Sequence, residues 1–410
     1  MGKRMPGLYR RPDQPGGMWH VDKVVHGERL CESCETSDEE EAKRYLIRRL
    51  EQIRQARVYG VRPDRIFRVA ATKYLTENQH KASIVSAAYM LQSLDPFIGE
   101  MSLGKLHDGT LQPYIATRRA QGIKSKSINN ALSIVRRILN LAARKWRDEH
   151  GLTWLETSPL ISMAPTHDAR KPYPLSWEEQ SELFKELPEH LAKMALFKVN
   201  TGTREQEVCR LRWDWEVEVP ELDTSVFLIP ADFGGRTKNS GVKNGEDRLV
   251  VLNDEARAVV ESCRGQHPER VFTFQGEPVG SINNSAWWKA RVRAAMKIYA
   301  ASGKTIPPEL LKKGQRGTLI TKELMEFMES VLPGLANVRP HDMKHTFGRR
   351  LRAAGVPLET RKVLLGHTNG DITSHYSAAE VAELLDAANR VCGGQSRKSP
   401  AMTLLKRKIA

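Results

Sequence analysis

The sequence predicts a multidomain protein that is mainly α-helical and carries small β-sheets. At 410 residues the chain is long enough for two or three domains with separate cores. Between residues 66 and 165, apolar side chains recur at helical spacing, as in Ile128, Leu132 and Val135. Short alternating runs near the N-terminus and between residues 213 and 252 indicate strands. Helical and mixed regions therefore follow one another along the chain.

The composition favours a polyanionic partner. The formal net charge is +15 and the isoelectric point is about 9.6, while 28% of the residues are charged. This excess of positive charge attracts nucleic acid first and an anionic membrane second. The chain has no run of about 18 apolar residues that could span a bilayer, and its N-terminus lacks the apolar segment of a signal peptide. We therefore expect a soluble cytoplasmic protein with no membrane partner.

The five cysteines do not form a disulfide pattern, because their number is odd and they are scattered, which fits a reducing compartment. Cys31 and Cys34 form a CxxC pair with His20 and His26 nearby, but no second pair follows at zinc-finger spacing. We interpret the pair as part of a hairpin strand and turn, and we predict no metal site.

Residues 1–60 predict a small sheet followed by a helix. Alternating residues indicate three strands, over residues 8–11, 18–25 and 28–33. Ser37 and Glu40 form a capping box that would begin the helix, which carries many lysines and arginines. On a basic chain this pattern favours a small DNA-binding module with a strand-borne reading face. The alternative is a solvated basic helix on an accessory domain.

Residues 61–168 predict a helical domain that lies between linkers near 60–64 and 159–174. Its helices are expected near residues 66–79, 83–98, 110–121 and 126–149. Basic residues occupy the outward faces and no base-reading motif is recognisable, so this domain is expected to grip the phosphates of a duplex. The candidate DNA-binding residues are Arg118, Arg119, Lys124, Lys126, Arg136 and Arg137.

Residues 172–392 predict a mixed α+β domain, and residues 393–410 form a tail. Ser176 caps the first helix of the domain, whose first turn carries Glu178 and Glu179. Strands are expected over residues 213–219, 226–229 and 248–252. The last two are joined by a polar, glycine-rich hairpin tip that carries Arg236, Lys238 and Lys243. We add Lys238 to the candidate DNA-binding residues.

The stretch over residues 339–376 carries most of the candidate chemistry. His341 and Lys344 lie three residues apart, which places them on one face of a predicted helix. The apolar stripe of the same helix consists of Met343, Phe347 and Leu351. Glycines at 355 and 366 end this helix and the next one, so His367 falls in a tight turn.

Tyr376 stands just before another predicted helix, which Ser377 and Glu380 open as a capping box, so its phenol can reach into a cleft. Its partners in the candidate site are Arg204, a lysine on the hairpin tip, His341, Lys344 and His367. Cations, imidazoles and a tyrosine suit a phosphodiester, because the phosphorane that develops is anionic and needs fixed positive donors. A free phenol has a pKa of about 10, so it needs those groups to attack at neutral pH.

Neither metal-dependent nor nucleotide-dependent chemistry is indicated. Clustered carboxylates, which hold divalent metal in hydrolytic nucleases, are not found near these residues. Gly303-Lys304-Thr305 suggests a phosphate-binding loop, but Ile298 stands where that motif needs glycine. A covalent protein–DNA intermediate preserves the bond energy, so we expect no cofactor.

Four segments of the chain resemble the tyrosine recombinases, also called the phage integrase family. They are TGTREQEVCRLRW, VKNGEDRLVVL, HDMKHTFGRRL and LLGHTNGDITSHY. The resemblance implies a site-specific DNA recombinase of a prokaryotic mobile element, associated with the nucleoid. It also implies a homotetramer on double-stranded attachment sites, assisted by DNA-bending or excision proteins. Residues 1–60 would then be the arm-site module, 61–168 the core-binding domain and 172–392 the catalytic domain.

By the same resemblance, Tyr376 would be the nucleophile that forms a covalent 3′-phosphotyrosine. Arg204 and Lys344 would clamp the phosphate, and His341 and His367 would hydrogen-bond it or move protons.

The resemblance also assigns residues to the leaving group and to support of the site. Lys243 would protonate the leaving 5′ oxygen, with Lys238 on the same tip as the alternative, and Glu207 would support the site.

Lys344 departs from the family pattern, because it stands where an HxxR motif has arginine. A single ammonium does not replace a two-pronged guanidinium at a bidentate site. The enzyme works with lysine, or Arg339 or Arg349 compensates, or the protein binds DNA as a regulator without cutting it. A type IB topoisomerase shares this chemistry and is a further alternative, although the predicted arm module argues against it.

Overall fold

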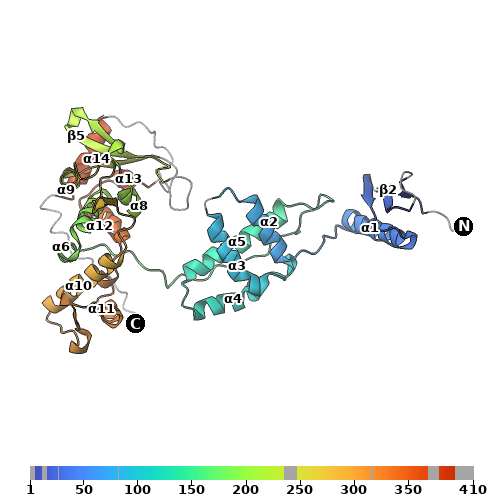
Figure 1. The fold of residues 1–410 in the computed structure, drawn as a ribbon, viewed down its shortest axis with the longest axis horizontal. Coiled ribbons are helices and arrows are strands. Elements are labelled where there is room, and N and C mark those ends of the chain that lie inside the picture. The colour runs from blue at the N-terminus through green and yellow to red at the C-terminus, as the bar shows by residue number, and fades with distance from the viewer. Residues whose placement is uncertain are drawn as a thin grey trace. The chain divides into compact units, whose positions relative to one another are not determined.

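The computed structural model describes residues 5–11, 16–25, 27–81, 83–234, 247–314, 317–367 and 378–392. The chain divides into two compact units, Met1–Arg170 and Lys171–Ala410. The predicted fold class is confirmed, since the described residues are mainly helical and form only small sheets (Figure 1). Within the described ranges, none of the helices combines the length and the apolar character that crossing a lipid bilayer requires.

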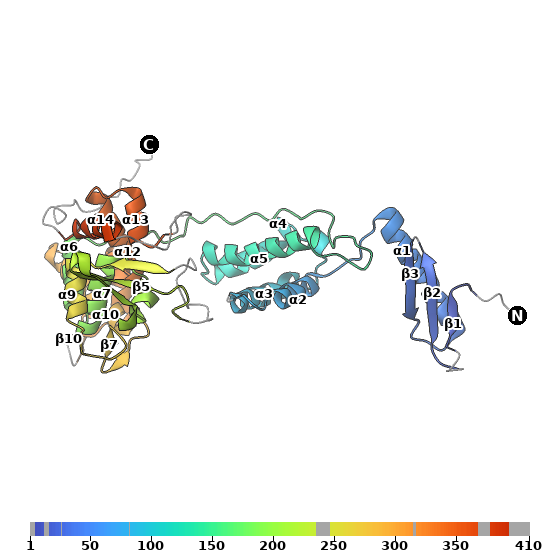
Figure 2. The same cartoon turned by 90° about the horizontal axis from the view of Figure 1, so that it is seen from above.

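The first unit begins with a three-stranded antiparallel sheet and a long helix (Figure 2). The strands are β1 (Leu8–Arg10), β2 (Trp19–Val25) and β3 (Glu28–Ser33), in that order across the sheet. α1 (Glu39–Tyr59) packs on the face where Val21 is buried. The helix begins after Asp38, whose side chain accepts a hydrogen bond from the Glu41 N–H. The predicted cap at Ser37 is therefore wrong by one residue, because the adjacent carboxylate is an equally favoured cap.

The rest of the first unit is helical. Its helices are α2 (Phe67–Glu77), α3 (Ile84–Ile98), the 3-10 turn η1 (Leu103–Lys105), α4 (Asp108–Ala120) and α5 (Ser125–Arg144). α5 packs against α2, α3 and α4 and buries Ile128 and Leu132, as its spacing predicted. The helix was expected to reach residue 149 but ends at Arg144. It stops early because Asp148 accepts the backbone N–H groups of two later residues and forms a turn.

The second unit begins with helices and a three-stranded antiparallel sheet. Its first elements are α6 (Trp177–Glu186), α7 (Glu189–Thr201), α8 (Glu205–Cys209), the 3-10 turns η2 (Trp213–Trp215) and η3 (Pro220–Leu222), β4 (Glu216–Val219), β5 (Thr224–Ile229), β6 (Arg248–Val251) and α9 (Asp254–Glu261). Ser176 caps α6 as predicted, and Glu179 completes a capping box. The strand expected over 213–219 begins only at Glu216. Its start is lost because the Trp213 indole donates to the His267 carbonyl and the chain turns there.

The remaining elements complete the second unit. They are the hairpin β7 (Thr273–Phe274) and β8 (Glu277–Pro278), α10 (Ser285–Ala301), the 3-10 turns η4 (Pro308–Leu310) and η5 (Leu335–Asn337), the hairpin β9 (Lys313–Gly314) and β10 (Gly317–Thr318), α11 (Lys322–Val331), α12 (Pro340–Ala353), α13 (Leu358–Leu364) and α14 (Ala378–Asn389). α12 contacts α7 and α13, and its predicted apolar stripe is buried. Gly355 and Gly366 end α12 and α13 with φ angles of 73° and 58°, as predicted. The capping box expected at Ser377 lies outside the described residues.

Candidate active site

The turn between α7 and α8 holds the first cation of the candidate site, Arg204. α7 ends at Gly202, whose φ of 63° is left-handed. The Arg204 N–H then donates to Glu207 Oε2 over 2.7 Å, and its Nη1 donates to Oε1 over 2.8 Å. The Glu207 side chain is 1% exposed and that of Arg204 is 22% exposed. The carboxylate thus holds the guanidinium from beneath, while part of the guanidinium stays accessible.

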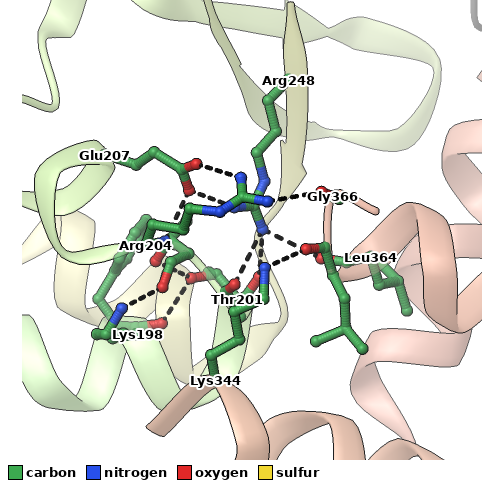
Figure 3. Close-up of polar contacts among 12 residues, drawn as sticks. Lys198, Thr201, Arg204, Glu207, Arg248, Lys344, Leu364 and Gly366 are labelled. Atoms are coloured by element: carbon green, nitrogen blue, oxygen red, sulfur yellow. Dashed lines mark hydrogen bonds and ion pairs between the residues drawn. The ribbon is translucent and has the colours of Figure 1, made fainter. Parts of the chain in front are cut away.

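Arg248, the first residue of β6, supplies a second guanidinium, and its side chain is only 3% exposed. Its Nη1 donates to Glu207 Oε2, and its Nη2 donates to backbone carbonyls at the ends of two helices. Those carbonyls belong to Thr201 at 3.4 Å, Gly202 at 3.1 Å and Leu364 at 3.3 Å (Figure 3). One buried side chain thereby connects α7, α8 and α13.

α12 brings His341 and Lys344 to the same place, one helical turn apart. Lys344 is buried, with 5% of the residue exposed, and its Nζ donates to the carbonyl of Leu365. His341 is exposed, and its ring packs edge-on against His345 with the centroids 4.9 Å apart. The imidazole therefore lies at the surface of the site and the ammonium lies below it.

Three basic side chains donate to the C-terminal end of α13. The consecutive carbonyls of Leu364, Leu365 and Gly366 accept hydrogen bonds from Arg248, Lys344 and Arg204 respectively (Figure 3). Such carbonyls have no partner within their own helix and carry partial negative charge, so they are natural acceptors for cations.

His367 follows this end directly. Its N–H donates to the Lys362 carbonyl over 2.9 Å, and the Gly366 N–H donates to the Val363 carbonyl over 2.8 Å. These two bonds are those of a glycine-ended helix, and they place the exposed His367 next to the cations.

Burial and nearby charges shift the pKa values of Glu207 and Lys344. Burial alone would raise the pKa of Glu207, but the Arg248 guanidinium and the hydrogen bonds from Arg204 outweigh it and lower the pKa to about 2. Burial, followed by the charges of Arg248 and Arg204, lowers the pKa of Lys344 to about 6. In the free protein the carboxylate is therefore charged at neutral pH, whereas the fold favours the neutral amine.

The two candidate imidazoles also favour their neutral form. The His341 ring is only partly buried, but this burial lowers its pKa, and the charge of Lys198 lowers the pKa further. Partial burial, then the charges of Lys344 and Arg204, lower the pKa of His367. Both rings are therefore neutral at neutral pH and keep a nitrogen lone pair that can accept a hydrogen bond or a proton, although the lowered pKa makes each a weaker base than a solvated imidazole.

Lys198 on α7 is a further buried cation. The residue is 0% exposed, and its Nζ donates to the carbonyl of Thr203, which directly precedes Arg204. Burial lowers its pKa to about 7, although the charge of Glu207 opposes that change. Lys198 therefore supports the turn that carries Arg204.

The site holds more positive groups than negative ones. The basic side chains are those of Lys198, Arg204, Arg248 and Lys344. Within the described part of the chain, Glu207 is the only carboxylate hydrogen-bonded to any of them. An anion bound beside Arg204 would find fixed donors already in place. Over the same ranges, no group of three or more His, Cys, Asp or Glu residues could hold a metal ion.

The structure brings five of the predicted site residues together, namely Arg204, Glu207, His341, Lys344 and His367. Three others, Lys238, Lys243 and Tyr376, lie outside the described residues.

Two residues of the site, Arg248 and Lys198, were not predicted from the sequence. A signal existed for each, since Arg248 opens a strand that is otherwise apolar, and Lys198 falls on the stripe that continues Leu191 and Met194 along α7.

Six of the candidate DNA-binding residues lie in the first unit, and the seventh, Lys238, lies outside the described residues. Arg119 lies at the end of α4, Lys124 is the cap of α5, and Lys126, Arg136 and Arg137 lie on α5; all five are exposed. Arg118 is half-buried, and its Nη1 donates to Gln121 over 2.7 Å. α5 contains no acidic residue, so every charged residue on its outward face is basic.

Comparison with solved structures defines the class of fold. Lambda integrase, solved as a dimer bound to a COC′ core site, matches with a TM-score of 0.50 and 13% identity over 99% of both chains. The Tn1549 transposon integrase, solved with a circular intermediate DNA, matches with a TM-score of 0.51 and 13% identity over 78% of this chain and 94% of that one. The chain therefore has an integrase-like fold.

Known integrases and recombinases are also similar to this chain in sequence. The integrase of Salmonella phage P22 is 21% identical over 416 aligned residues, which cover 94% of each chain. The tyrosine recombinase XerC of Rhizobium meliloti is 23% identical over 298 residues, 70% of this chain and 76% of the relative. No family model matches the sequence. In sequence the chain is therefore similar to members of the tyrosine recombinase, or phage integrase, family.

Proposed function

We propose that this protein is a site-specific DNA recombinase, the integrase of a phage or another mobile element, which cuts and rejoins DNA through a covalent 3′-phosphotyrosine. The observation that supports this most is the convergence of Arg204, Lys344 and Arg248 on the end of α13 around the single carboxylate of Glu207. Such an excess of fixed cations suits a phosphodiester, whose negative charge grows as it is attacked.

In the proposed reaction the phenol oxygen of Tyr376 attacks phosphorus and forms a new P–O bond. The bond to the 5′ oxygen breaks, and that oxygen takes a proton from Lys243, or from Lys238 on the same tip. Arg204 and Lys344 hold the non-bridging oxygens, and His341 or His367 accepts the phenol proton. The reverse attack by a 5′ hydroxyl rejoins the strand and releases the tyrosine, so no cofactor is consumed.

The proposal has two consequences, one for the oligomeric state and one for the contacts with DNA. Exchange between two duplexes requires four strand cleavages, and each chain supplies one Tyr376, so we propose a homotetramer on paired double-stranded sites. Arg119, Lys126, Arg136 and Arg137 would hold the duplex by its phosphates, with Lys124 beside them.

The test is covalent trapping. Binding sites are first selected from random duplexes with the Tyr376→Phe chain, and the selected duplex is then made with a bridging sulfur at each candidate scissile position. The wild-type chain should form a covalent adduct, whose peptide carries the nucleotide on Tyr376, and the Tyr376→Phe chain should form none. Adducts on random DNA together with relaxation of supercoils would instead indicate a topoisomerase.

Lys344 favours a second candidate, a DNA-binding regulator that does not cut. Its amine is buried and donates to the Leu365 carbonyl, and its pKa is lowered to about 6, so a clamp made with it is weaker than one made with arginine. Tight binding to the selected duplex without any adduct would support this candidate.

A further inference from the structure

Arg248 lies at the centre of the cation cluster, yet the proposed reaction gives it no contact with DNA. We propose that Arg248 is a positioning residue, which holds the Glu207 carboxylate and the carbonyl ends of α7 and α13 in one arrangement. In that arrangement Arg204, Lys344 and His367 are directed toward the same phosphate. This inference rests on the proposed function, and it adds to that function a residue that acts from beneath the site.

The first support is the shared carboxylate. Glu207 Oε2 accepts both the Arg248 Nη1 and the Arg204 N–H, while Oε1 accepts the Arg204 Nη1 over 2.8 Å. Arg248 therefore fixes the carboxylate from the buried side, and the carboxylate fixes Arg204 on the accessible side. Without Arg248, Glu207 loses one of its two guanidinium partners, and the carboxylate that holds Arg204 is fixed less firmly.

The second support is the pair of helix ends. The Arg248 Nη2 lies 3.1 Å from the Gly202 carbonyl and 3.3 Å from the Leu364 carbonyl. The first carbonyl belongs to the turn before Arg204, and the second belongs to the turn before His367. These turns are far apart in sequence, so the guanidinium is a direct link between the segments that carry two of the proposed groups.

The third support is the tight fit of the chain around this guanidinium. A Cβ atom added to Gly366 would lie 2.7 Å from Arg248 Nε and 2.9 Å from its Cζ, too close for either atom to remain in place. The glycine at this position therefore gives the Arg248 side chain the room that it occupies.

Stability alone does not account for an arginine here. Burying a charge costs free energy that pairing only partly returns, and apolar residues of similar volume are often equally or more stabilising. Among the described residues, the buried Nε of Arg248 has no hydrogen-bond partner, which adds to the cost. A side chain that is costly to bury but reaches Glu207 and two helix ends fits a role in geometry better than a role in packing.

Its charge also reaches the proposed reacting groups. Arg248 is one of the cations that lower the pKa of His367, together with Lys344 and Arg204, and the neighbouring His345 acts in the same direction. Among the charged groups near Lys344, Arg248 has the largest effect on its pKa. The charge and the hydrogen bonds of Arg248 can therefore be tested separately.

Two variants make that separation. Arg248→Met removes both the charge and the hydrogen bonds. Arg248→Lys keeps the charge, but one ammonium cannot span Glu207 and the helix ends as a guanidinium does. The matched control is Arg264→Met, which removes another ion-paired arginine of the same unit. Arg264 is 44% exposed and bonds Glu216 over 2.6 Å.

The first readout is the titration of His367 by NMR in the free full-length chain with labelled histidine, assigned by loss of the signal in His367→Gln. Arg248→Met should raise the pKa of His367, because a positive neighbour is removed. Arg248→Lys and Arg264→Met should leave it as in the wild type. A role in packing alone would not move this value.

The second readout is the single-turnover rate of adduct formation on the selected duplex. Both Arg248 variants should be slower by roughly 10²-fold, the order expected when reacting groups are misplaced by about 1 Å. Their affinity for the uncut duplex should stay within a few-fold of the wild type, and Arg264→Met should match the wild type in both measurements.

Full activity of folded Arg248→Lys would overturn the inference, because charge alone would then suffice. An unchanged His367 titration in folded Arg248→Met would also overturn it. If Arg248→Met does not fold, as judged by circular dichroism, the rate of Arg248→Lys decides. If the wild-type chain forms no Tyr376-dependent adduct, the proposed function fails, and the His367 titration still tests whether Arg248 acts on that segment.

Discussion

α5 and the candidate active site gather positive charge in opposite ways. α5 spreads Lys126, Arg136, Arg137 and Arg144 along an exposed surface that contains no acidic residue. The candidate site instead buries Lys344 and gives each of its cations defined acceptors on neighbouring segments. On α5 the charged groups extend from an exposed surface, whereas in the candidate site direct hydrogen bonds fix them in place.

This difference in burial implies different roles, with exposed cations attracting DNA and buried cations acting on the phosphate that reacts. Exposed cations act over about a Debye length, are screened by salt and can replace one another, so they suit phosphate binding along a duplex. Buried cations act over a few ångströms in a low dielectric, where a displaced group cannot be replaced by its neighbour. We therefore expect substitutions on α5 to change affinity and substitutions in the candidate site to change rate.

The largest effect is expected for Arg204→Ala. The rate of adduct formation should fall by roughly 10²–10³-fold, the loss typical when one fixed donor to a developing anion is removed. Affinity for the uncut duplex, measured by fluorescence anisotropy, should change by only a few-fold. Arg212→Ala is the control, because Arg212 is 32% exposed and paired with Asp214 over 2.8 Å. A loss of affinity as large as the loss of rate would contradict the prediction that the candidate site controls rate while α5 controls affinity.

A smaller loss of rate is expected when the glycines that end α13 and α12 are replaced by alanine. Gly366 and Gly355 have φ angles of 58° and 73°, so alanine is strained at both positions. A Cβ at Gly366 would lie 2.7 Å from Arg248 Nε, whereas one at Gly355 would meet nothing within 4 Å. Gly366→Ala should slow adduct formation by about 10²-fold and Gly355→Ala by far less, although both lower the melting temperature. Equal losses of rate would mean that backbone strain, and not the fit around Arg248, is responsible.

The features that were predicted correctly from the sequence depend on short-range patterns. The helix starting at Ser176, the apolar stripe of α12 and the glycine ends at Gly355 and Gly366 each depend on a few neighbouring residues. The errors were also local, as at Asp38, where two adjacent residues compete for one cap.

Contacts between distant segments could not be predicted in the same way. Arg248 is 41 residues from Glu207 and 116 residues from Leu364 in sequence, and nothing in the local pattern shows that all three meet. The positions of Arg204 and His341 came from their order in family-like segments. Those segments also include Arg248, but they do not show which of their arginines is buried.

The pH dependence of stability tests the burial of Lys344 directly. Its pKa is lowered to about 6 in the folded protein, so unfolding takes up a proton between about pH 6 and the normal lysine range near 10. Stability should therefore rise with pH in this window, by at most about 1.4 kcal/mol per unit. Hydrogen exchange of α12 amides between pH 6 and 9 measures the slope, which Lys344→Met should reduce. Lys193→Met, which removes an ammonium paired with Glu189, is the control, and an equal slope in wild type and Lys344→Met would contradict the prediction.

The smallest effect is expected on α5. Removing Arg136 and Arg137 together should weaken DNA binding several-fold and reduce the slope of log affinity against log salt by about 2, since each phosphate contact releases about one counterion. The control is the double variant of Arg68 and Lys73 on α2, whose cations are paired with Asp95 at 2.8 Å and Glu77 at 3.1 Å. Because those carboxylates already neutralise them, their removal should leave the salt slope nearly unchanged. The rate of adduct formation at saturating protein should be the same in both double variants, because charges that only attract the duplex do not act on the phosphate that is cut. A rate that falls with the α5 variant even at saturation would mean that α5 also aligns the DNA for cleavage.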